Sequence, residues 1–306
     1  MESVMKNTDL RVKIYGVRGS YPPTTGDITR FGVNTTCLRF DIGKHLIIID
    51  AGTGIINLGY DLLKEIKSED NEQNLFKLHL LFTHTHIDHL MGFPYFSMIY
   101  IPGSQFHVIS PDMNDYSIEE ILETWMSHGF FPVNMSELPS TFTYYDFGEE
   151  KQIYFFENDF EIVTGAASEE KTGWIGKISC LRNYTHPKGG SYIYRVENAK
   201  GNSIVFATDI EGFVGGDQRL IQFAKDANIL IHDAQYSLKE YLMFQGFGHS
   251  TYQMACEIAQ KANVRQLILT HHDPKHSDQE LSELEQKAQE IFPETLMATE
   301  TMEFEF

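Results

Sequence analysis

The chain has 306 residues, with a hydrophobic fraction of 42% and a charged fraction of 22%, which is an ordinary composition for a globular protein. This composition excludes intrinsic disorder, the apolar runs are too short to span a bilayer, and Met1–Leu10 is polar and lacks a signal-peptide core. Because both a spanning segment and a signal core are missing, we expect a cytoplasmic protein that binds no membrane. The net charge of −19 disfavours a long nucleic acid as a partner.

Strand-like segments and amphipathic helical segments alternate along the chain. The expected strands are rich in β-branched or aromatic residues and span 11–17, 37–42, 45–51, 77–83, 106–110, 161–164, 192–197, 203–208, 229–232 and 266–270. Apolar spacing predicts helices over 55–66 and over 281–291, the latter behind the capping box Ser277–Glu280. A second capping box, Ser250–Gln253, predicts a helix through Ala262. Strand pairs near each end with helices between them predict a four-layer α/β sandwich, αββα, of two mixed sheets with outer helices.

Residues 112–160 do not follow this alternation and hold several aromatic side chains, among them Trp125 and Phe130. We interpret the chain as a single domain, 1–306, with an insertion at about 112–160. This insertion is expected to form a lid or a homodimer surface, or to add aromatic packing to the core.

Three cysteines, Cys37, Cys180 and Cys256, lie far apart in the chain. Their odd number and their spacing give neither a disulfide framework nor a Cys-x-x-Cys zinc site. We therefore expect each of them to pack as a small core residue.

A cluster of histidines follows one of the predicted strands. The segment His84-Thr85-His86-Ile87-Asp88-His89 holds three of the 13 histidines and begins where the strand at 77–83 ends. The imidazoles of His84 and His86 point the same way in an extended segment, and a turn near Asp88 directs the later residues elsewhere, so one loop can serve two metals. Imidazole and carboxylate are ligands for zinc, manganese or iron where thiolate is absent. The alternative is a polar turn with chance histidines.

This segment has the H-x-H-x-D-H pattern and resembles the hallmark of the metallo-β-lactamase superfamily. The resemblance covers nearly the whole chain, including Gly16–Ser20 (GVRGS), Asp50–Gly54 (DAGTG) and later ligand segments in the family order. It implies a binuclear centre in which one divalent ion is held by His84, His86 and His186 and the other by Asp88, His89 and His271. Asp209 would bridge the two ions, which we expect to be Zn²⁺, with Mn²⁺ or Fe²⁺ as alternatives.

Two neighbouring residues have other expected roles. His272 competes with His271 for the last ligand position, but successive strand residues face opposite ways. Asp50 is similar to the turn aspartate of the family and is expected to brace the His84–His89 loop rather than to bind metal.

Two later motifs resemble the phosphodiesterase and tRNase Z-like branch of the superfamily. Leu230–Gln235 is similar to its H-E-A-T motif, with Asp233 in place of Glu, and Gly248–Thr251 matches its H-S-T helix start. The resemblance implies that His249 donates a proton to the leaving oxygen or stabilises the phosphate, next to the free amides of a helix start. Asp233 would orient His249 or only brace its own strand end, and Asp88 is counted as catalytic as well as metal-binding.

The GVRGS opening is similar to bacterial cyclic-nucleotide phosphodiesterase-like hydrolases. We therefore expect hydrolysis of a small phosphodiester, such as a 3′,5′-cyclic nucleotide, by a hydroxide that bridges two metal ions. The tRNase Z subfamily carries an arm for tRNA between the positions of His186 and Asp209, where this chain has only 22 residues. A tRNase Z-like endoribonuclease and a thioester or lactone hydrolase are the alternatives. A binding protein without chemistry is disfavoured because all seven ligand candidates are present.

Overall fold

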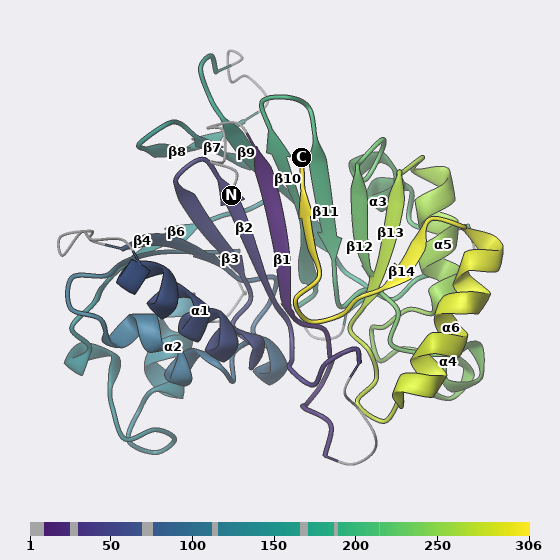
Figure 1. The fold of residues 1–306 in the computed structure, drawn as a ribbon, viewed down its shortest axis with the longest axis horizontal. Helices are drawn as coiled ribbons and strands as arrows, with labels where there is room; N and C mark the ends of the chain where they lie inside the picture. Colours follow the sequence, from purple (N-terminus) through teal and green to yellow (C-terminus); the bar gives the residue numbers. More distant parts are fainter. Residues whose placement is uncertain are drawn as a thin grey trace.

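The computed structural model describes residues 9–24, 30–68, 76–111, 116–165, 171–186, 189–213 and 215–306. Two mixed β-sheets pack face to face, and helices cover the outer face of each sheet (Figure 1). The predicted four-layer α/β sandwich is therefore confirmed. Within the described part of the chain, no helix is both long enough and apolar enough to cross a membrane.

The first sheet has seven strands in the order β15-β1-β2-β3-β4-β5-β6. From β3 to β6 they run parallel, whereas β15, β1, β2 and β3 pair antiparallel. Every residue of β2 and β3 is buried, because both faces of this part of the sheet are covered. The strands are β1 (Leu10–Gly16), β2 (Cys37–Ile42), β3 (His45–Ile49), β4 (Lys77–Leu81), β5 (Gln105–Ser110), β6 (Thr141–Asp146) and β15 (Glu303–Glu305).

The second sheet has eight strands in the order β14-β13-β12-β11-β10-β9-β7-β8. Its strands β11 to β14 are parallel, so their carboxyl ends meet at one edge of the sheet. The strands are β7 (Lys151–Phe155), β8 (Phe160–Thr164), β9 (Gly176–Asn183), β10 (Ser191–Asn198), β11 (Ser203–Ala207), β12 (Ile229–Asp233), β13 (Gln266–Thr270) and β14 (Thr295–Met297).

Three apolar clusters fill the three interfaces between the four layers. One lies between the sheets, one joins the first sheet to α1 (Gly54–Ser68) and α2 (Ile118–Trp125), and one joins the second sheet to its helices. The helices on the second sheet's side are α3 (Gln218–Phe223), α4 (Leu238–Phe244), α5 (Tyr252–Lys261) and α6 (Asp278–Ile291). Each cluster contains one of the three cysteines, all buried and free, as predicted.

Residues 112–160, expected as an insertion, divide in the structure into three parts. Residues 112–115 lie outside the described residues. The next part holds α2 and a short 3₁₀ turn at Met135–Glu137, and the last part supplies β6 to the first sheet and β7 to the second. The strand β6 escaped prediction because, at the edge of its sheet, it alternates exposed with half-buried residues instead of forming a buried run.

The cap of α5 differs from the prediction by one residue. Thr251 is the N-cap, and its hydroxyl accepts from the Met254 amide. Ser250 instead donates its hydroxyl to the Ile210 carbonyl at 2.7 Å and accepts from the Gly212 amide at 2.9 Å. The predicted box Ser277–Glu280 does cap α6, through hydrogen bonds in both directions.

Candidate metal centre

The candidate ligands come from the carboxyl ends of strands at one edge of the sandwich. His84 follows β4, His186 follows β9, and Asp209 follows β11. His271 is the first residue after β13, which pairs with β12, the neighbour of β11. A centre formed by short segments after parallel strands is the usual place for a site in an α/β protein.

The structure brings all seven sequence-predicted ligands together in two sets that share Asp209. In each set, one ligand atom from every residue lies within 4.8 Å of the others. Apart from His86, which is exposed, every member is buried. The sets are His84, His86, His186 and Asp209, and Asp88, His89, Asp209 and His271.

Asp209 divides its two carboxylate oxygens between the sets. Its Oδ2 lies 3.6 Å from the Nε2 atoms of both His84 and His186. Its Oδ1 lies 3.2 Å from His89 Nε2 and 3.1 Å from His271 Nε2. Ligand atoms bound about 2.1 Å from a tetrahedral cation are about 3.4 Å apart, so these spacings fit one cation on each side of Asp209.

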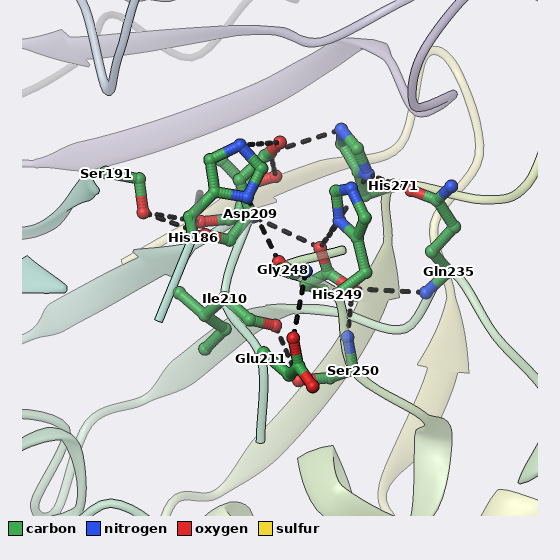
Figure 2. Close-up of polar contacts among 12 residues, drawn as sticks. His186, Ser191, Asp209, Ile210, Glu211, Gln235, Gly248, His249, Ser250 and His271 are labelled. Atoms are coloured by element: carbon green, nitrogen blue, oxygen red, sulfur yellow. Dashed lines mark hydrogen bonds and ion pairs between the residues drawn. The ribbon is translucent and has the colours of Figure 1, made fainter. Parts of the chain in front are cut away.

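The histidines also have the hydrogen-bond pattern of metal ligands. The buried Nε2 atoms of His84, His89 and His271 make no well-aligned hydrogen bond within the described chain, although those of His89 and His271 face the carboxylates of Asp88 and Asp209 at 3.1 to 3.5 Å. Their Nδ1 atoms are occupied: His89 donates to Asp50 at 2.8 Å and His271 donates to Gln235 at 2.9 Å (Figure 2 for His271). Buried nitrogens that face carboxylates at such spacings can be satisfied by a cation bound between them, and metal-binding histidines donate their second N–H in this way. The residues present therefore fit a pair of divalent cations.

The electrostatics of the cluster favour the same conclusion. Burial holds the pKa of His84 well below its ordinary value, which keeps the imidazole neutral and able to bind a metal. For His89 the effect of burial is outweighed by Asp209, Asp88 and Asp50, and the pKa lies well above the ordinary value. Without a bound cation, protons on histidine must compensate the buried carboxylates, and a divalent ion can take over that role.

Asp50 holds the ligand loop in the bracing position expected for it. One carboxylate oxygen accepts from the Thr83 amide, and the other accepts from the Thr83 hydroxyl and from His89, all at 2.8 Å. Asp50, Asp209 and His271 all have a positive φ, of 64°, 53° and 61°. This conformation is uncommon outside glycine, so the surrounding contacts must hold these residues in place.

The motif Gly16–Ser20 packs against two ligand candidates, Asp88 and His271. The Ser20 amide donates to Asp88 Oδ2 at 2.8 Å. A Cβ on Gly19 would lie 2.3 Å from the His271 ring, so only glycine leaves room for that imidazole.

His249 lies beside the centre but outside both sets that share Asp209. Its Nδ1 donates to Asp233 Oδ2 at 2.8 Å, and its ring stacks on that of His271 with centroids 4.9 Å apart (Figure 2 for His249 and His271). Asp233, His249 and His271 also lie close enough to form a third candidate group for a metal. However, Asp233 already accepts from the backbone amides of Asp209 and Ser250, which makes it a brace as well as the partner of His249.

His272 is turned away from the centre. It is fully buried, and its Nε2 donates to the Ala298 carbonyl at 2.9 Å. Burial lowers its pKa to about 3, so the ring is neutral. The competition between His271 and His272 is thus resolved in favour of His271, as the alternation of side chains predicts.

Two supporting residues were missed by the sequence analysis. Gln235 accepts from His271, and Glu211 accepts from the amides of Gly246 and Gly248 at 2.8 and 3.0 Å (Figure 2 for Glu211 and Gly248). Both glycines have φ of +89°, so the turn before His249 depends on them. The two closely spaced glycines were the available signal, but nothing in the sequence pointed to Glu211 as their anchor.

Comparison with known proteins points to one family and one fold. A family model described as "Beta-lactamase superfamily domain" matches residues 45–272. A Ribonuclease Z of Thermoplasma acidophilum is 26% identical over 328 residues, which cover 97% of each chain. The fold is similar to that of the metallo-beta-lactamase fold protein YhfI from Bacillus subtilis, with a TM-score of 0.64, 17% identity and coverage of 98% and 100%. It is also similar to the short form of human tRNase Z, with a TM-score of 0.62, 18% identity and coverage of 96% and 98%.

The expectation of a small substrate with no long nucleic acid is wrong. It rested on the net charge of −19, whereas a relative of nearly equal length is a ribonuclease. The physical reason is that a net charge is an average over the whole surface. Local arginines and bound cations decide whether a polyanion can reach one edge of the molecule.

Proposed function

Because the chain belongs to the beta-lactamase superfamily and is a hydrolase of the metallo-β-lactamase fold, we propose that it cleaves phosphodiester bonds of RNA at a binuclear centre. The carboxylate of Asp209, divided between two ligand sets, is the observation that carries this proposal. We propose Zn²⁺ as the metal, because five imidazoles and two carboxylates form the set, and Mn²⁺ or Fe²⁺ as alternatives.

The expected chemistry is hydrolysis at phosphorus. Divalent cations held by the two ligand sets that share Asp209 would lower the pKa of water and neutralise phosphoryl oxygens. His249 supplies the proton that the departing ribose oxygen needs. Its ring lies next to those of His186 and His271, but His249 belongs to neither of the ligand sets that share Asp209. Asp233 keeps the His249 Nδ1 atom occupied, so Nε2 is the nitrogen available to the substrate.

RNA as the substrate class is supported by two observations. The first is the name Ribonuclease Z, shared by relatives from several organisms. The second is an exposed aromatic ring flanked by arginines near the centre. Tyr184 is 66% exposed, lies two residues before His186, and has the Arg182 and Arg219 guanidiniums within 5.1 and 5.9 Å of its ring. Aromatic rings and arginines side by side can stack bases and neutralise a backbone.

A 3′,5′-cyclic nucleotide is the second candidate substrate. Between His186 and Asp209, residues 189–208 contain only the hairpin of β10 and β11 and their short flanks. This compact connection has no described extension that resembles an arm for a folded RNA. Cyclic nucleotides contain the same kind of phosphodiester bond and need no such extension.

The test is to incubate the metal-loaded protein with an RNA that carries a 3′ extension, and separately with 3′,5′-cyclic AMP and with a p-nitrophenyl thioester. Cleavage of the RNA at a defined bond, lost in Asp209→Ala, is the expected result. Hydrolysis of cyclic AMP alone would favour the second candidate. Hydrolysis of the thioester alone would refute a phosphodiesterase.

A further inference from the structure

A small apolar pocket lies against the same loop that carries the metal ligands. Its volume is about 300 Å³, and Thr85, Ile87 and Leu90 form one wall. These residues are interleaved with the candidate ligands His84, His86, Asp88 and His89. The pocket and the metal centre therefore share the segment His84–His89, and Leu90 directly follows it.

The opposite wall is aromatic and exposed. It is formed by α2 and its flanks, including Tyr116, Trp125 and Phe130. Tyr116 and Phe130 are 66% and 67% exposed, and the Trp125 and Phe130 rings lie 6.0 Å apart at 31°. Exposed large apolar side chains gathered at one place usually mark a binding surface.

The residues that line the pocket favour a neutral, planar ligand. Among the described residues that line the pocket, Glu120 alone is charged, and its carboxylate already accepts from the Ser117 amide and hydroxyl at 2.8 and 3.0 Å. An apolar, aromatic surface suits a flat molecule that can stack on it.

We propose that this pocket binds the base of a nucleotide that adjoins the scissile phosphate. This inference rests on the proposed function and names the part of the substrate that the metal centre does not hold. The base stacks on Trp125 or Phe130, while its phosphate reaches His86 and Asp88 across the loop that both sites share. Single-stranded RNA is commonly recognised by stacking its bases on aromatic side chains in this way.

Tryptophan fluorescence can test the pocket without measuring catalysis. The chain has only two tryptophans, and Trp174 contacts Tyr154 rather than the pocket. In a Trp174→Phe variant of the full chain, all indole emission reports on Trp125. Titration with adenosine 5′-monophosphate is expected to quench this emission in a saturable way, whereas ribose 5-phosphate, which lacks a base, leaves it unchanged.

A matched pair of further variants localises the effect. Phe130→Ala in the Trp174→Phe background should weaken nucleotide binding on the order of tenfold, the scale of one lost base–aromatic contact. Tyr60→Ala removes a comparably exposed ring on α1 and should not change the titration. No quenching, equal quenching by ribose 5-phosphate, or an unchanged titration in Phe130→Ala would overturn the proposal. So would a shift to a smaller oligomer in Phe130→Ala without an effect on nucleotide binding, which would assign the pocket to a second copy of the chain.

Failure of this inference can be distinguished from failure of the proposed function. If the wild-type protein cleaves RNA and Phe130→Ala leaves KM unchanged, the base pocket is refuted and the phosphodiesterase stands. If the nucleotide quenches Trp125 but no phosphodiester is cleaved, the pocket stands as a nucleotide-binding site only, and the proposed reaction is refuted.

Discussion

The Nδ1 atom of His249 donates to the Oδ2 atom of Asp233 across 2.8 Å, and this contact fixes which nitrogen of His249 can face a substrate. Asp233 is fully buried and ends β12, so its position is set by the sheet rather than by a loop. The pair is therefore held in a fixed position beside His271, the ligand candidate that follows the neighbouring strand β13.

His249→Ala is expected to lower phosphodiester turnover by roughly 100-fold or more, because a general acid has been removed. Metal content should stay near that of the wild type, since the two ligand sets that share Asp209 do not include His249. Kinetics and elemental analysis on the same preparation check both points. A loss of metal in this variant would show that the group Asp233, His249 and His271 is a ligand set instead.

The leaving group separates two roles of His249. The p-nitrophenolate ion departs without a proton, whereas a ribose oxygen needs one. His249→Ala should therefore impair RNA cleavage more than hydrolysis of bis(p-nitrophenyl) phosphate. Equal losses would indicate that His249 positions the phosphate and does not donate a proton.

Asp233→Asn should reduce turnover less than His249→Ala, because the proton donor itself stays in place. The amide keeps only one of the two oxygens that accept from N–H groups, and it cannot stabilise a protonated imidazole. The double variant should be no slower than His249→Ala alone, since both substitutions affect one function. Turnover measured for the four proteins of this cycle is the test. Additive losses would mean that Asp233 acts independently of His249.

Gly19→Ala should disrupt the second ligand set while the fold survives. The new Cβ would lie 2.3 Å from the His271 ring, so the imidazole must leave the position in which its Nε2 lies 3.1 Å from Asp209 Oδ1. We expect a lower metal content and an unchanged circular dichroism spectrum. Gly129→Ala is the matched control, because its Cβ would meet no atom closer than 3.9 Å. Full metal content in Gly19→Ala would show that His271 is not needed.

Asp50→Asn should weaken metal binding by roughly 10- to 100-fold, the usual effect of losing a group that orients a ligand. The asparagine can still accept from Thr83, but it no longer carries the charge that faces His89. Competition with a fluorescent zinc chelator measures the affinity. Unchanged affinity would mean that the loop holds its shape without Asp50.

Much of the centre was predictable because its ligands follow buried strands. The hydrophobic runs before His84, Asp209 and His271 locate these residues at one edge, and the spacing of the first motif separates two ligand sets. Glu211 and Gln235 were not predictable, since their role depends on loops that meet only in the folded chain. The prediction that no long nucleic acid binds failed because it used the net charge of the whole chain. A net charge does not determine the local charge around the metal centre.

The number of metal ions per chain tests the central claim most directly. Protein purified without chelators should contain about two transition-metal ions per chain by elemental analysis, because Asp209 serves one ligand set with each oxygen. Asp209→Ala should lose metal from both sets. Protein that contains no metal and takes up neither zinc, manganese nor iron would contradict the account.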